Sequence, residues 1–157
     1  MNEIDRVLDQ LRRSRGGGAW HGPSLEEVLS GVDAGTAAAR PIPDAHTIWE
    51  IALHVATWQE VVRRRIAGHE VTPTEAENWP RVEQPSDAAW EAAVAKLRDT
   101  RERLEREVAE LSPVALAEPP RAGEKTRYAL LHGIIQHDLY HAGQIALLAK
   151  AARSSAP

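Results

Sequence analysis

Two histidines near the C-terminus, His137 and His141, are the residues whose type and spacing best fit metal chemistry. On an α-helix, a four-residue step turns the side chain by only about 40° around the axis, so the two imidazoles share one face on successive turns. Paired histidines at this spacing can converge on one metal ion. Two buried histidines that form only hydrogen bonds are the alternative interpretation. Both stand in a helical series that is expected to face the core and that comprises Leu130, Ile134, Gln144 or Ile145, and Leu148.

A third metal ligand is expected from a neighbouring helix, because helical bundles build metal sites from side chains on facing helices. His54 is the best candidate, since it lies one turn after Ile51 and one turn before Trp58 and so borders an apolar stripe. Three histidines with an open coordination position are typical of a catalytic metal site rather than a closed structural one. The site would suit zinc, nickel, iron or manganese, and the sequence does not choose among these metals.

The chain has no cysteine, so it can form neither a disulfide nor a thiolate metal site. The nucleophile of a reaction at the histidines would therefore be water or a low-molecular-weight thiol that arrives as a cofactor. Three neutral imidazoles do not offset the positive charge of a metal ion, so the ion would lower the pKa of a bound water or thiol.

A general base is less evident, and three side chains are candidates. Glu50 lies one turn before His54 and could support that residue or accept a proton, although surface solvation also accounts for it. Asp138 is about 100° around the helix from its neighbour His137, so we expect it to support a ligand rather than share the ion. Gln144 could bond to His141 or to a substrate, or serve helix packing.

The remaining histidines are expected to have structural roles. His132 is assigned to packing or to the surface, and His46 to the neighbourhood of a helix cap. His21 could approach the site, but a role in anchoring its Trp-His-Gly-Pro turn is the preferred interpretation. His69 is expected to be exposed.

Helical periodicity dominates the elements that must position these side chains, and no segment shows the alternation of a strand. Ser24 and Glu27 predict a capping box at the start of a short helix. The third long helix has a polar gap in its apolar series near Arg101. The long connections over 16–46 and 68–85 allow a crossover topology, so we predict an all-α four-helix bundle. The four long helices are expected over residues 2–15, 47–67, 86–111 and 126–152.

The length favours one domain over residues 1–157, and a small molecule is the substrate expected for its metal site. The net charge is −4 with histidine neutral, and the basic run Arg63–Arg65 fits a solvated helix face, so we expect no nucleic-acid partner. No apolar run could span a bilayer and the N-terminus lacks the features of a signal peptide, so we expect no membrane partner and a cytoplasmic location. The last few residues are expected to be disordered.

A homodimer is also expected. The last helix carries apolar residues away from its predicted core series, and an exposed apolar face often marks a subunit contact. These residues are Leu131, Ile135, Leu139 and Leu147.

Three segments resemble a known family. The stretch His137–Ile145 (HDLYHAGQI) looks like the final-helix motif of the DinB/YfiT-like superfamily. The stretch Ile48–Trp58 resembles the second-helix motif of that superfamily, and Trp20–Leu25 resembles an early segment found in part of it. The matching segments occur in the expected order over most of the chain.

The resemblance implies a four-helix bundle with crossover connections, a divalent metal held by His54, His137 and His141, and frequent dimerisation. Some members of the superfamily are S-transferases that use bacillithiol, mycothiol or glutathione, and others are described as metal-dependent hydrolases. Many have no known activity. The resemblance thus implies a metal-dependent S-transferase or hydrolase, with a non-enzymatic metal- or ligand-binding bundle as the alternative.

Overall fold

The computed structural model describes residues 2–154, and these residues form helices and loops without any strand. The predicted all-α class is therefore confirmed. The prediction of disorder for the last few residues falls on 155–157, which lie outside the described part of the chain. No helix among the described residues has both the length and the apolarity needed to cross a membrane. The long helices are α1 (Glu3–Gly16), α4 (Ile48–Ile66), α6 (Asp87–Ala109) and α8 (Arg127–Ser154), and the short ones are α2 (Leu25–Leu29), α3 (Ala34–Ala38), α5 (Glu75–Asn78) and α7 (Pro113–Ala117).

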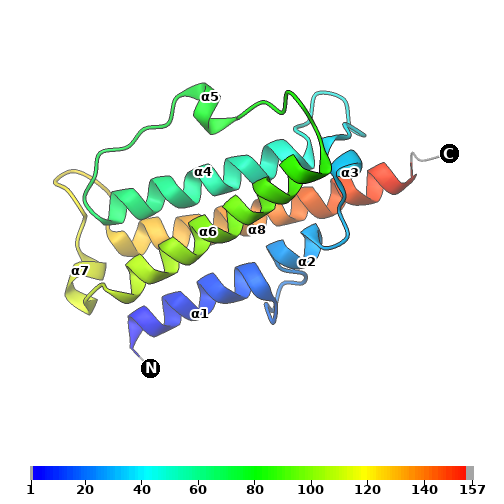
Figure 1. The fold of residues 1–157 in the computed structure, drawn as a ribbon. Coiled ribbons are helices and arrows are strands. Elements are labelled where there is room, and N and C mark those ends of the chain that lie inside the picture. The colour runs from blue at the N-terminus through cyan, green and yellow to red at the C-terminus, as the bar shows by residue number, and fades with distance from the viewer. Residues whose placement is uncertain (1, 155–157) are drawn as a thin grey trace.

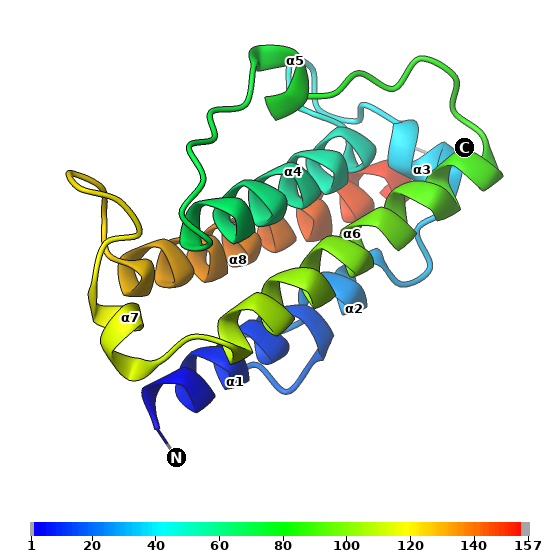
Figure 2. The ribbon, with the colours of Figure 1, turned by 60° about the vertical axis from the view of Figure 1, so that its left-hand side comes forward.

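The four long helices lie side by side, with α1 and α4 each packed against both α6 and α8 (Figures 1 and 2). Helices α1 and α8 run in one direction, whereas α4 and α6 run in the opposite direction. Since α4 and α6 are parallel, the connection over 67–86 returns along the length of the molecule, and it carries α5 on the way (Figure 1). The connection from α1 to α4 stays at one end instead and holds α2 and α3. A crossover is thus present in one of the two long connections.

Local capping explains where the helices begin. In α4 the Thr47 hydroxyl accepts from the Glu50 N–H at 3.1 Å, and the Glu50 carboxylate accepts from the Thr47 N–H at 2.8 Å. The predicted box at α2 also forms, since the Glu27 carboxylate accepts from the Ser24 N–H at 2.7 Å. Helix α7 was not predicted. It begins because Ser112, just after the predicted end of the preceding helix, caps a new turn that has proline at its first position.

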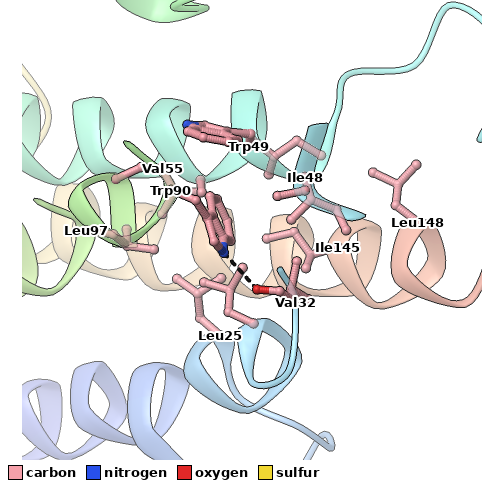
Figure 3. Packing of buried hydrophobic residues seen from close by; sticks show 14 of the residues in the cluster. Leu25, Val32, Ile48, Trp49, Val55, Trp90, Leu97, Ile145 and Leu148 are labelled. Carbon is pink, nitrogen blue, oxygen red and sulfur yellow. Dashed lines mark hydrogen bonds between the residues drawn. The ribbon is translucent and has the colours of Figure 1, made fainter. Parts of the chain in front are cut away.

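Two apolar clusters form the core. The first joins α2, α3, α4, α6 and α8 around Trp49 and Trp90, whose ring centroids lie 5.2 Å apart (Figure 3). The Trp90 indole N–H donates to the Val32 carbonyl at 2.7 Å and ties the segment between α2 and α3 to α6. The second cluster lies toward the opposite ends of the long helices and includes Leu104 and Leu131.

A buried polar layer separates the two clusters at the polar gap that the sequence shows near Arg101. The Arg101 guanidinium donates through Nη2 to the Asp138 carboxylate and, at 3.3 Å, to the Ser14 hydroxyl. The Gln59 amide also donates to Asp138, at 3.1 Å, and its oxygen accepts from the Thr100 hydroxyl at 3.0 Å. All five side chains are buried, and the ion pair with its neutral neighbours offsets part of the cost of burying two charges inside the bundle.

The core face of α8 differs from the predicted series. Leu131 and Ile135, expected to lie off the core, are 0 % and 7 % exposed, whereas Leu130 is only partly buried. The single-stripe prediction was wrong because α8 packs against α1, α2, α3, α4 and α7, which cover a wider face than one neighbour would. Leu139 is partly buried and Leu147 is exposed. The homodimer stays a prediction, with Leu147 alone of the four as a fully exposed apolar side chain.

In the predicted solvated face at Arg63–Arg65, Arg64 is exposed as expected, whereas Arg63 and Arg65 are partly buried and interact within the chain. Arg63 lies 2.8 Å from Glu60 and 3.2 Å from Glu107, and Arg65 donates to the Val71 carbonyl at 2.7 Å.

Candidate metal centre

Three histidines from two antiparallel helices meet at one point of the bundle. His54 comes from the middle of α4, and His137 and His141 come from successive turns of α8. One nitrogen from each ring can be chosen so that all three lie within 4.8 Å of one another, which is a group that could hold a metal ion. The Nε2 atoms of His54 and His137 are 3.0 Å apart.

The partners of the outer ring nitrogens fix the orientation of two imidazoles. The His54 Nδ1–H donates to the Asn78 carbonyl at 2.7 Å, and the His141 Nδ1–H donates to the Gln144 side-chain oxygen at 2.6 Å. Because the proton resides on Nδ1 in both rings, each Nε2 keeps its lone pair. Such hydrogen bonds to carbonyl oxygens are the usual support of histidine ligands to metals.

His137 has a different neighbour. Its Nδ1 is buried without a hydrogen-bond partner, and so is the Asp138 Oδ1, which lies 3.8 Å away. With a proton on Nε2, His137 donates to the His54 Nε2 at 3.0 Å. With the proton on Nδ1 instead, a positive ring edge faces the carboxylate oxygen, and the Nε2 lone pair is free to bind a metal.

Burial keeps all three imidazoles neutral near pH 7. It lowers the pKa of His54 and of His141, and for His137 burial together with the two neighbouring histidines lowers the pKa to about 3. Neutral imidazole is the form that binds a metal. The residues present therefore fit a divalent transition metal, because three neutral imidazoles converge at one point and none of them carries a positive charge.

The crossover connection completes the surroundings of the histidines. The Trp79 ring is stacked between His54 and His46, with centroid distances of 3.8 Å and 3.6 Å. Asn78 uses its backbone carbonyl for His54 and accepts from the Trp58 indole N–H at 2.8 Å through its side chain. Sequence analysis missed Asn78 and Trp79, because they lie in a proline-bearing loop whose position depends on the parallel arrangement of α4 and α6.

A pocket of about 360 Å³ adjoins the histidine cluster. His141 and Trp79 line it on the side of the cluster, and His46 forms another part of its wall. Tyr140 and Leu147 also line the pocket and are 66 % and 59 % exposed. The cluster thus has a neighbouring space that is open to solvent and large enough for a small organic molecule.

The comparison with known families agrees with this geometry. The family model of the DinB superfamily matches residues 19–145, a range that holds all three histidines. The chain belongs to the DinB superfamily. No curated protein and no solved structure shows a significant match to it. Family membership and the three-histidine cluster together fit a metal-binding protein of the DinB type.

The candidate bases of this DinB-superfamily chain lie in different settings. Gln144 contacts His141, as described above, and Asp138 lies beside His137 but is bound to Arg101 and Gln59. Glu50 does not contact His54 through any described hydrogen bond. It caps α4 and lies 3.1 Å from the Arg40 guanidinium.

The other histidines of the DinB-superfamily chain separate into two groups. His46 precedes the capping residue of α4, where a cap-related position was expected, but it also lines the pocket and lies 3.5 Å from the Glu50 carboxylate. Nothing in the sequence next to Thr47 indicated that His46 would line a pocket. His132 packs against the Tyr128 ring at 4.2 Å, and His21 and His69 are exposed.

Proposed function

We propose that this protein binds a divalent transition metal through the Nε2 atoms of His54, His137 and His141. We further propose that it is an enzyme that transfers a low-molecular-weight thiol to an electrophilic small molecule. The observation that carries the proposal is the convergence of three neutral imidazoles, two buried and one partly buried, whose outer nitrogens face oxygen atoms. Three histidine ligands leave an open coordination position, which is typical of catalytic sites.

The protein's own residues would prepare the site. A divalent ion held by three neutral imidazoles would lower the pKa of a thiol or water that reaches it. Asn78 and Gln144 hold the Nδ1 protons and thereby keep the Nε2 lone pairs of His54 and His141 directed inward. Trp79 covers the flat face of His54 and limits the approach of water from that side.

The environment of the carboxylates favours a thiol over water as the nucleophile. Hydrolysis by an activated water commonly uses a nearby general base. Both candidate carboxylates are engaged elsewhere, Asp138 by Arg101 and Gln59, and Glu50 by the start of α4 and Arg40. A thiol is acidic enough that binding to a metal suffices to deprotonate it. The pocket beside His141 would hold the electrophile.

Hydrolysis is the second candidate, and the pair of His46 and Glu50 favours it. His46 lines the pocket, and its Nδ1 lies 3.5 Å from the carboxylate of Glu50. A carboxylate beside an imidazole orients the ring, which is the arrangement of many general bases. In this version of the proposal, His46 would accept a proton from water at the pocket.

Metal analysis of protein purified without an affinity tag tests the centre. We expect one tightly bound metal per chain after reconstitution with zinc, nickel, iron or manganese, and loss of that metal in His137→Ala. His132→Ala is the matched control, because His132 lies on the same helix but outside the cluster. Absence of stoichiometric metal would contradict the proposal, as would equal loss in both variants.

Activity assays then separate the reactions. The metal-loaded protein is incubated with bacillithiol, mycothiol or glutathione and a panel of electrophiles, and with esters and amides in the absence of thiol. Thiol-dependent product that disappears in His137→Ala supports transfer. Thiol-independent cleavage that is lost in His46→Gln supports hydrolysis. A metal-loaded protein without either activity would support the non-enzymatic binding bundle and contradict the proposed enzyme.

A further inference from the structure

The pocket beside the histidine cluster extends from the core to the surface of the bundle. Its buried lining residues include Ile51 and Leu148, which belong to the first apolar cluster. Its exposed lining residues include Ile42, Tyr140 and Leu147. In the described part of the chain, these are three of the six large apolar side chains that are exposed. Exposed apolar side chains that gather in one place commonly mark a binding site.

The size and walls of the pocket suit a flat apolar molecule. Its volume is about 360 Å³, whereas a cavity of about 150 Å³ holds one benzene molecule, so roughly two aromatic rings can enter. Both faces of the Trp79 indole are covered, one by His46 and the other by His54. A ligand can therefore meet this ring only along its edge, and edge-to-face contact is a favourable arrangement for two aromatic rings.

The charges around the pocket disfavour an anion. Among the described residues that line it, none is a lysine or an arginine, and Asp44, the one carboxylate, forms no ion pair with a described residue. Arg40 lies outside the lining, where it contacts Glu50 at 3.1 Å and donates to the Ala45 carbonyl. Lys150 is exposed and also lies outside the lining. A carboxylate in the pocket would lose hydration without gaining a cationic partner, which is costly.

We propose that this pocket selects an uncharged, flat, apolar electrophile and discriminates against anionic ones, because it lacks a lining cation and carries Asp44. That the ligand is the electrophile rests on the proposed function, whereas the preference for an uncharged ligand is a property of the pocket itself. In the proposed transfer, the thiolate sulfur bonds to an electrophilic carbon, and the leaving group departs with its electron pair. The pocket holds the body of the electrophile beside His141.

Calorimetric titration of the full-length, chelator-treated protein tests the preference without metal or thiol. The probes are naphthamide and naphthoate, which have nearly the same shape and differ in charge, at about pH 8, where a free imidazole is neutral. We expect naphthamide to bind saturably with one site per chain and at least tenfold more tightly than naphthoate. The proposal is wrong if naphthoate binds as tightly. It is also wrong if neither probe binds, as when a second copy of the chain covers the mouth.

A first pair of variants tests the role of Asp44. Asp44→Asn should strengthen naphthoate binding severalfold and leave naphthamide binding unchanged, because it removes only the charge. Asparagine is chosen because it tolerates the left-handed backbone at this position, where φ is 62°. Asp99→Asn removes the same charge from an exposed position of α6 and should alter neither affinity. Equal effects of the two substitutions would overturn the assignment to Asp44.

A second pair locates the ligand at the pocket. Leu147→Ala should weaken naphthamide binding severalfold, because it removes apolar contact area at the mouth. Val114→Ala changes an exposed aliphatic side chain on α7 and should leave the affinity unchanged. Both positions are exposed, so neither substitution is expected to disturb the fold. Unaltered binding in Leu147→Ala would place the ligand elsewhere and refute the proposal.

An activity measurement extends the test to the electrophile. The metal-loaded protein and its thiol are given an activated chloronitroarene as the carboxamide and as the carboxylate, and each rate is compared with the uncatalysed rate. We expect the carboxamide to have the higher kcat/KM relative to that reference. Turnover of the carboxylate alone would refute the preference and leave the transferase proposal intact. Absence of all turnover would contradict the proposed enzyme, and the naphthamide titrations would still decide the charge preference.

Discussion

Replacing His137 with glutamine should reduce the pH dependence of stability in the metal-free protein. Burial and two neighbouring imidazoles lower the pKa of His137 from 6.5 to about 3 in the folded state. In the unfolded chain the same imidazole titrates near its ordinary pKa of about 6.5. Between these values the unfolded state binds the additional proton. The free energy of unfolding is therefore unaffected by this group above about pH 6.5 and falls as the pH is lowered toward 3.

The size of the effect follows from the difference between the two pKa values. Each pH unit within the window lowers the free energy of unfolding by about 1.4 kcal/mol for one such histidine. From about pH 7.5 to about pH 5, His137 alone should cost about 2 kcal/mol. The pKa of His54 and that of His141 are also lowered by burial, so both add to the loss with the same sign. His137→Gln should remove only the part of this loss that the His137 imidazole contributes.

Urea unfolding at a series of pH values, with a chelator present, measures this difference. The original chain and His137→Gln are compared with His69→Gln, in which an exposed imidazole is removed. We expect a smaller fall of the unfolding free energy toward acid in His137→Gln and the full fall in His69→Gln. If the two pH profiles of the original chain and His137→Gln are parallel, the burial argument for the histidine cluster fails.

Other perturbations test the core and the support of the cluster. Arg101→Met should destabilise the protein by about 3–5 kcal/mol in urea unfolding because it leaves Asp138 charged and buried, and the added change Asp138→Leu should recover most of that loss. Should Arg101→Met cost no more than a surface substitution, the buried pair is not formed. Leu104→Ala, at a fully buried site of α6 in the second core cluster, should cost about 2–5 kcal/mol by the same measurement. Gln144→Leu removes the acceptor of the His141 Nδ1–H, so metal affinity should fall by about 10–100-fold in a competition titration with a chelating dye. Unchanged affinity would show that this hydrogen bond does not support the site.

The helices and their starting points could be predicted from the sequence because the determining interactions are local. A capping side chain contacts a backbone group three residues away, so Ser24 and Thr47 mark helix starts whatever the rest of the chain does. The same holds for the spacing of His137 and His141, which depends only on the geometry of one helix. The short helices α3, α5 and α7 escaped prediction because few residues form them and their apolar pattern is too brief to be distinctive.

The width of the core face of α8 was decided by its neighbours. Periodicity identifies the direction of a core face but not how many helices cover it. With five elements packed around α8, Leu131, Ile135 and Asp138 are buried, and the expected exposed stripe is reduced to Leu147. The polar gap at Arg101 was visible in the sequence, but its partner on α8 was not, since 37 residues separate the two side chains.

By itself, the sequence determined that two imidazoles lie on one face of the last helix, and family resemblance added His54 as their partner. Only the tertiary structure could bring His54 within 3.0 Å of His137, because that distance depends on the antiparallel packing of α4 against α8. It alone also placed Asn78 and Trp79 against His54, since the parallel course of α4 and α6 forces the connecting chain back over the site. Helix periodicity is a property of neighbouring residues, whereas the environment that keeps the imidazoles neutral is built from segments that are distant along the chain.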